Sequence, residues 1–168
     1  RRFGHVLSQH PREDYVLSTK IGRVLTAARQ PPEVNWKDPP SFDSRYDYSA
    51  AGTRRSIEDS LQRMGVESID IVLIHDLSPD NGDMKERWVE YFEEARKGAF
   101  VELAKLRDEG LIKAWGMGVN TPDPALKAIE VADPDIFLLA CQYSLLDPRP
   151  ALVDTFPQLA AWDISVLV

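Results

Sequence analysis

The sequence predicts an α/β fold of parallel strands, and three observations carry this prediction. Short apolar runs alternate with amphipathic helical patterns along nearly the whole chain, as expected of strands joined by crossover helices. The runs are almost continuously apolar, as in strands covered on both faces. Polar residues stand at the ends of several runs, where a (β/α)₈ barrel collects its functional groups, and no glycine-rich phosphate loop follows any run. We therefore expect an incomplete (β/α)₈ TIM barrel rather than an open doubly wound sheet.

Five runs are predicted to be strands, and helical spacing of apolar residues predicts the segments between them. The strands are residues 15–19, 69–75, 112–119, 136–143 and 164–168. The helices are residues 53–64, stopped by a glycine, a charged segment over 84–97, residues 100–109, a short helix opening at Asp123, and residues 148–162. The chain opens in helical spacing and closes on an apolar strand, so we expect it to be the middle of a longer protein, with residues 1–168 in one partial barrel domain.

The composition and net charge of the chain disfavour several classes of binding partner. The 168 residues are 43% hydrophobic and carry a formal charge of −7 with a pI near 5.0, which disfavours nucleic acid and anionic membranes. No apolar run approaches the ~20 residues of a membrane-spanning helix. The single cysteine, Cys141, excludes a disulfide framework and a thiolate metal cluster. We expect a soluble protein of the reducing cytoplasm.

One long segment between predicted elements, residues 21–51, is rich in proline and aromatic residues. Loops of this length in a compact domain usually serve a function, and the aromatic content favours a lid over the site. Its prolines and aromatic residues include Pro31, Pro32, Trp36, Pro39, Pro40, Phe42, Tyr46 and Tyr48.

Four polar residues are predicted to gather at one end of the sheet. Strand alternation makes Lys20, His75, Asn120 and Gln142 the last residues on one face of four different strands. A row of small residues in the third strand, Ala114, Gly116 and Gly118, leaves room for a flat group against the sheet.

Each of these residues alone has a purely structural explanation, such as a solvated lysine or a structural histidine. Together, a lysine beside a histidine forms a cationic site that depresses the pKa of a neighbouring Tyr hydroxyl. A Schiff-base lyase using Lys20 stays open, because a barrel strand end suits such a lysine. A metal site is not expected, since the chain has three histidines and alternation puts Asp76 on the opposite face from His75.

Several motifs resemble the aldo-keto reductase family. They are Tyr-Val-Leu-Ser-Thr-Lys at 15–20, Arg-Ser-Ile-Glu-Asp-Ser-Leu-Gln-Arg-Met-Gly at 55–65, Ile-Asp-Ile-Val-Leu-Ile-His at 69–75 and Gly-Leu-Ile-Lys-Ala-Trp-Gly at 110–116. Their order and spacing are similar to the family over nearly the whole chain. Residues 42–52, 74–76, 116–120 and 143–147 resemble its aldose 1-dehydrogenase branch.

The resemblance implies a (β/α)₈ enzyme that uses NAD or NADP and an Asp-Tyr-Lys-His tetrad, with the present chain covering barrel strands three to seven. Lys20 aligns with the tetrad lysine and His75 with its histidine, while the Asp and Tyr would precede Arg1. Gln142 matches the glutamine that binds the nicotinamide carboxamide, and Asn120 stands where the family has Ser-Asn. The implied reaction is hydride transfer to or from a small-molecule sugar or other aldehyde or ketone, and we expect the isolated chain to be inactive. The alternatives are a non-catalytic or partner-binding barrel and the lyase.

Overall fold

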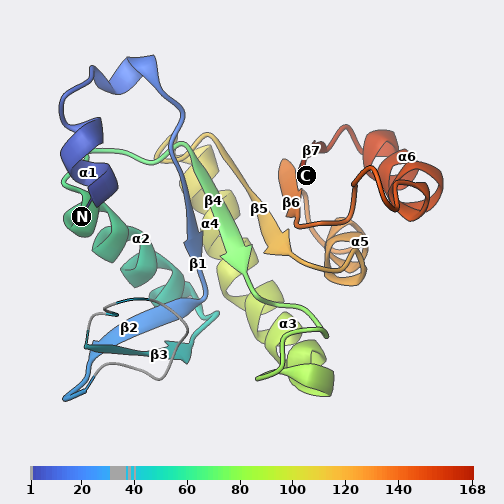
Figure 1. The fold of residues 1–168 in the computed structure, drawn as a ribbon, viewed down its shortest axis with the longest axis horizontal. Coiled ribbons are helices and arrows are strands. Elements are labelled where there is room, and N and C mark those ends of the chain that lie inside the picture. The colour runs from blue at the N-terminus through green and yellow to red at the C-terminus, as the bar shows by residue number, and fades with distance from the viewer. Residues whose placement is uncertain (1, 31–36, 38, 40) are drawn as a thin grey trace.

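The computed structural model of the chain describes residues 2–30, 37, 39 and 41–168, and its centre is a five-stranded parallel sheet (Figure 1). The strand order is β1-β4-β5-β6-β7, so the strands are neighbours in the order in which the chain makes them. All four pairings are parallel, which confirms the predicted topology. The strands are β1 (Ser18–Ile21), β4 (Ile71–His75), β5 (Ala114–Val119), β6 (Ile136–Leu139) and β7 (Ser165–Leu167).

Helices connect these strands. The longest, α2 (Ala50–Met64), begins where the Ser49 side chain accepts a hydrogen bond from the Gly52 amide and ends at Gly65 in a left-handed conformation. Gly98 separates α3 (Trp88–Lys97) from α4 (Ala99–Asp108). The other helical segments are α1 (Arg2–Leu7), η1 (Arg12–Asp14), η2 (Lys85–Arg87), α5 (Asp123–Ile129), η3 (Ala151–Thr155) and α6 (Phe156–Ala161).

Some predicted boundaries are wrong for local reasons. The first strand begins at Ser18 rather than residue 15, because the Leu17 amide donates to the Asp70 carboxylate at 2.8 Å instead of entering a ladder. The predicted strand over 136–143 is β6, and it ends at Leu139 because Cys141 has a φ of 60° and turns the chain. The helix predicted over 148–162 is a π-helical turn, η3, followed by the shorter α6.

The segment 21–51 is not irregular throughout. It contains an antiparallel hairpin of β2 (Arg23–Ala27) and β3 (Phe42–Tyr46). Tyr48, counted among the lid aromatics, is fully buried and belongs to the core. Pro31, Pro32, Trp36 and Pro40 lie outside the described residues, and the lid stays a prediction.

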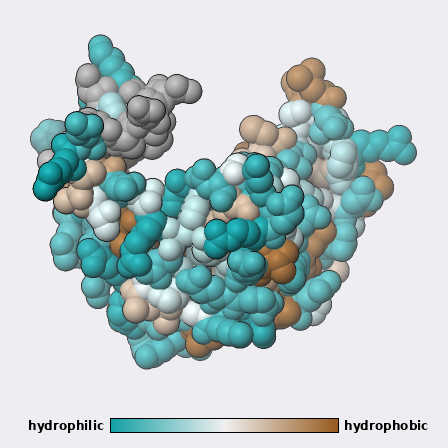
Figure 2. All heavy atoms as spheres, turned by 90° about the horizontal axis from the view of Figure 1, so that it is seen from below, coloured by the Kyte–Doolittle hydropathy of each residue, from teal (hydrophilic) through white to brown (hydrophobic). Residues whose placement is uncertain are grey.

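The two faces of the sheet differ in burial. Val72, Trp115 and Phe137 point from neighbouring strands into the core and are fully buried with the helices. On the other face Ser18 and Lys20 of β1 are exposed, and Leu167 of β7 is 43% exposed. The prediction that every strand is covered on both faces is therefore wrong for β1 and β7. Figure 2 shows one side of the molecule as mostly hydrophilic, with separate hydrophobic patches.

Two features are absent from the described ranges of the chain. None of the helices there is long and apolar enough to cross a membrane. The same ranges contain no group of three His, Cys, Asp or Glu residues arranged to hold a metal ion.

Candidate active site

Lys20 lies within β1, opposite Leu73 of β4, and its side chain runs across the face of the sheet that points away from the helices. It reaches as far as β5: a Cβ placed on Gly118 would lie 3.3 Å from Lys20 Cε and 3.7 Å from its Nζ. Gly118 thus makes room for the aliphatic stem of the lysine. The expectation that the small residues leave space for a flat ligand is wrong at this position, because Lys20 fills it.

Gly116, the neighbouring small residue on this face of β5, is required by the backbone of the adjacent strand. A Cβ on Gly116 would lie 1.6 Å from the carbonyl oxygen of Ile136 in the adjacent strand. Gly116 therefore permits the close approach of β5 and β6, and it offers no ligand space.

His75 is the last residue of β4 and lies on the same face of the sheet as Lys20, two residues beyond the Leu73 that pairs with it. The buried Tyr48 hydroxyl donates a hydrogen bond to the His75 carbonyl at 2.8 Å, which anchors the strand end. Burial lowers the pKa of His75 below its ordinary value, the Asp76 carboxylate opposes this, and the Lys20 and Arg23 charges add to the lowering. At neutral pH the ring is therefore mainly unprotonated.

Asp76 does not lie on the opposite face from His75. Its φ of 58° is left-handed and breaks the strand alternation directly after β4. The carboxylate turns back, so that its Oδ1 lies 3.1 Å from His75 Nε2. Its Oδ2 accepts a hydrogen bond from Arg23 Nε at 2.7 Å. Sequence periodicity has no means of predicting this contact, because it depends on one backbone angle.

Asn120 and Gln142 come together at the ends of β5 and β6. Asn120 follows β5 directly, and its Nδ2 donates to Asp80 Oδ2 at 2.7 Å. Gln142 lies beyond the turn at Cys141 rather than on β6, and its Nε2 donates to the Asn120 carbonyl. Among the described residues, no hydrogen bond reaches Asn120 Oδ1 or Gln142 Oε1.

Three further polar residues lie around Asp76, and of these the sequence predicts only Tyr46 to be near the site, as an aromatic residue of the lid. Arg23 opens β2, Tyr46 closes β3, and Asn81 lies in the loop after β4. The Tyr46 hydroxyl accepts hydrogen bonds from Arg23 Nη2 and Asn81 Nδ2, each at 2.8 Å. The one available signal was Gly22, whose φ of 107° turns the chain from β1 into the hairpin immediately before Arg23.

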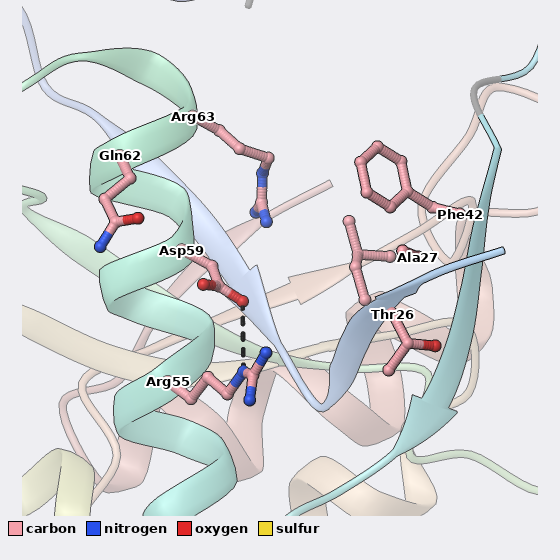
Figure 3. A pocket seen from close by; sticks show the side chains of 8 residues that line it. Thr26, Ala27, Phe42, Arg55, Asp59, Gln62 and Arg63 are labelled. Atoms are coloured by element: carbon pink, nitrogen blue, oxygen red, sulfur yellow. Dashed lines mark ion pairs between the residues drawn. The ribbon is translucent and has the colours of Figure 1, made fainter.

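A pocket of about 510 Å³ lies between α2 and the hairpin, away from Lys20 and His75. Figure 3 shows Arg55 and Asp59 of α2 on one side and Ala27 and Phe42 of the hairpin on the other. Arg55 and Asp59 pair with each other at 3.7 Å. The third charged residue of the lining, Arg63, donates a hydrogen bond to the Ser60 hydroxyl at 2.9 Å. With no histidine or cysteine in its lining, this pocket offers no evident reaction chemistry.

The fold and its polar residues define a class of protein. It consists of parallel β/α units that carry a lysine and a histidine on one face of adjacent strands, near the carboxyl ends of these strands. The model of the Aldo/keto reductase family matches residues 2–160. The chain therefore belongs to the aldo-keto reductase family, and its parallel sheet is part of the (β/α)₈ barrel of that family.

Individual proteins that are similar to this chain support the family assignment. The chain is 32% identical to a D-threo-aldose 1-dehydrogenase of a Pseudomonas species over 95% of its length and 47% of the relative. It is 38% identical to a pyridoxal 4-dehydrogenase of Microbacterium luteolum, over 86% of this chain and 45% of that one. A solved aldo-keto reductase of Pseudomonas aeruginosa superposes with a TM-score of 0.67 at 29% identity, covering 99% of this chain and 51% of that one. The chain thus spans about half the length of these relatives.

Proposed function

We propose that the protein containing this chain is an NAD(P)-dependent oxidoreductase that transfers hydride between the nicotinamide and an aldose or another aldehyde or ketone. The observation that carries the proposal is the meeting of Lys20 and His75 on one face of adjacent parallel strands, in a chain of the aldo-keto reductase family. The two curated dehydrogenases, one acting on an aldose and one on pyridoxal, support an aldehyde-type substrate. Residues 1–168 then form part of one barrel domain, and the single cysteine and acidic charge support a cytoplasmic location.

In this proposal Lys20 is a fixed positive charge. Its stem lies against Gly118, which places its ammonium group beside β5 at the strand ends. There it lowers the pKa of the phenol that the family supplies from outside this chain, and it stabilises the phenolate. Lys20 forms no bond to the substrate.

His75 contacts the substrate oxygen and shares its proton. The ring is mainly unprotonated near neutral pH, because burial and the nearby Lys20 and Arg23 charges lower its pKa. It is therefore able to accept a proton when a hydroxyl is oxidised and to orient a carbonyl when one is reduced.

Asn120 and Gln142 fit the carboxamide of a nicotinamide cofactor. Their side-chain Oδ1 and Oε1 atoms accept no hydrogen bond from the described residues, so they are able to accept from an amide N–H₂ group. The bonds that Asn120 makes to Asp80 and receives from Gln142 hold both amides in place. The cofactor supplies the hydride acceptor or donor; these residues orient it.

The test uses the complete protein, purified as wild type and as Lys20→Met, His75→Gln and the control Lys97→Met. Lys97 is an exposed lysine at the end of α3, so its substitution removes the same charge away from the site. We expect cofactor-dependent aldose or aldehyde turnover in the wild type and control, and a loss of about 10²–10⁴-fold in kcat for Lys20→Met and His75→Gln. Cofactor affinity, measured by fluorescence quenching, should change little in all variants.

Two results overturn the proposal. A stoichiometric borohydride-trapped adduct on Lys20 after incubation with aldehyde would favour the lyase. A folded wild type that binds neither NAD nor NADP would favour a non-catalytic barrel.

A further inference from the structure

The proposed roles leave the pair of Arg23 and Asp76 without a function, although Asp76 lies against His75 and Arg23 against Asp76. Asp76 adopts a left-handed φ of 58°, which is unfavourable for most residues. This conformation is what places its Oδ1 3.1 Å from His75 Nε2. The backbone thus turns this carboxylate back toward a proposed site residue, which points to a role beside it.

Arg23 holds Asp76 from the other side. Its Nε donates to Asp76 Oδ2 at 2.7 Å, and its guanidinium lies over the Tyr46 ring at 4.8 Å from the ring centre. Asn81 Nδ2 donates hydrogen bonds to the Tyr46 hydroxyl at 2.8 Å and to the Asp76 carbonyl at 3.0 Å, and so connects the two residues. The carboxylate beside His75 is therefore fixed by both its side chain and its backbone.

We propose that the Arg23–Asp76 pair is a positioning unit for His75, in which Asp76 holds the imidazole at Nε2 and acts as the counter-charge when the ring takes a proton. The proposal rests on the catalytic role proposed for His75 and adds the residues that control it. Arg23 and Asp76 touch His75 or each other rather than the reacting atoms, so they act through the imidazole.

The charged groups around His75 shift its pKa in opposite directions. Lys20 approaches from β1, Arg23 from β2, and Asp76 from its own chain segment; Tyr48 approaches only the backbone carbonyl. Burial, Lys20 and Arg23 favour the neutral ring, and Asp76 alone favours the protonated ring. Removing Asp76 and removing Arg23 should therefore move the His75 titration in opposite directions, whereas a loss of packing alone would not separate the two variants in this way.

The experiment uses the complete protein and two variants, Asp76→Asn and Arg23→Gln. Asparagine tolerates the left-handed conformation and keeps the shape of the side chain, so Asp76→Asn removes the charge with little change in the backbone. The His75 titration is followed by ¹H–¹⁵N NMR of the imidazole, assigned by the resonance lost in His75→Gln. The control is Asp83→Asn, because Asp83 also pairs with Arg23, at 3.9 Å, and is not among the groups that act on His75.

We expect the pKa of His75 to fall by about 1 unit or more in Asp76→Asn, to rise in Arg23→Gln, and to move much less in Asp83→Asn. The acid limb of kcat/KM for oxidation should shift in the same two directions. Unchanged or parallel titration shifts in the two variants would overturn the positioning unit. Opposite NMR shifts without a shift of the pH–rate limb would retain the contact and instead overturn the proton role proposed for His75.

Discussion

Asp70 ties the beginnings of three strands together, and replacing it by Asn should show how much this tie contributes to stability. The residue is 3% exposed and directly precedes β4. Its carboxylate accepts a hydrogen bond from the Leu17 amide at 2.8 Å and pairs with Lys113 at 2.8 Å and with Arg12. Leu17 precedes β1 and Lys113 precedes β5, so one side chain fixes both neighbours of β4.

The magnitude follows from the carboxyl pKa. Burial alone would raise the pKa of Asp70, but the Leu17 amide, Lys113 and Arg12 together lower it from 3.8 to about 2. That lowering corresponds to about 2 kcal/mol of folding free energy at neutral pH. Because the folded-state pKa lies below the unfolded value, this contribution is complete well above 3.8 and is lost as the pH falls through about 2.

Urea unfolding of the complete protein, followed by tryptophan fluorescence, measures the effect. Asp70→Asn should lower the free energy of unfolding by about 2 kcal/mol at about pH 7, and the difference from wild type should shrink by roughly half at about pH 3. Asp108→Asn, which removes an exposed carboxylate at the end of α4, is the control and should change stability little. An Asp70→Asn effect that is the same at both pH values would refute the electrostatic reasoning.

Three further substitutions probe the packing and hydrogen bonding around the candidate site. Gly118→Val should displace the Lys20 side chain that lies 3.3 Å from a Cβ at this position, lowering kcat while the protein stays folded by circular dichroism. Gly116→Ala should instead lower stability, because its Cβ meets a backbone carbonyl; normal folding of that variant would contradict the close strand approach. Tyr48→Phe should cost about 1 kcal/mol in thermal or urea unfolding, since it removes a buried hydrogen bond to the His75 carbonyl, and an unchanged stability would show that this bond contributes nothing.

The sequence was sufficient for the parallel topology because each strand and helix carries a local pattern. Ile57 and Leu61 mark the inner side of α2, and Gly65 ends it as predicted. The β2–β3 hairpin was missed because β3 is polar and exposed, so it lacks the alternation that identifies a half-covered strand. Proline and aromatic residues in the same segment favoured a loop instead.

The candidate site was predictable only in part. Lys20 and His75 are placed on one face by strand register, which alternation anticipates. The position of Asp76 depends on a left-handed backbone angle and that of Gln142 on a turn at Cys141, and neither has a periodic signal. Hairpin pairing places Tyr46 beside Arg23, which contacts Asp76, and a single sequence does not reveal this contact between segments.

The hairpin leaves the sheet after β1 and returns before α2 at an adjacent point, so its two ends form one closed joint. Arg23 pairs with Tyr46 in the first rung, and the Asp47 amide donates to the Gly22 carbonyl at 3.0 Å just outside it. Because the joint is closed by these residues, substitutions at the exposed positions of β3 should leave β1 and α2 in place. Recombination that exchanges residues 25–45 between related enzymes, and keeps Arg23, the buried Val24 and Tyr46, should therefore graft new surfaces beside an unchanged Lys20 and His75.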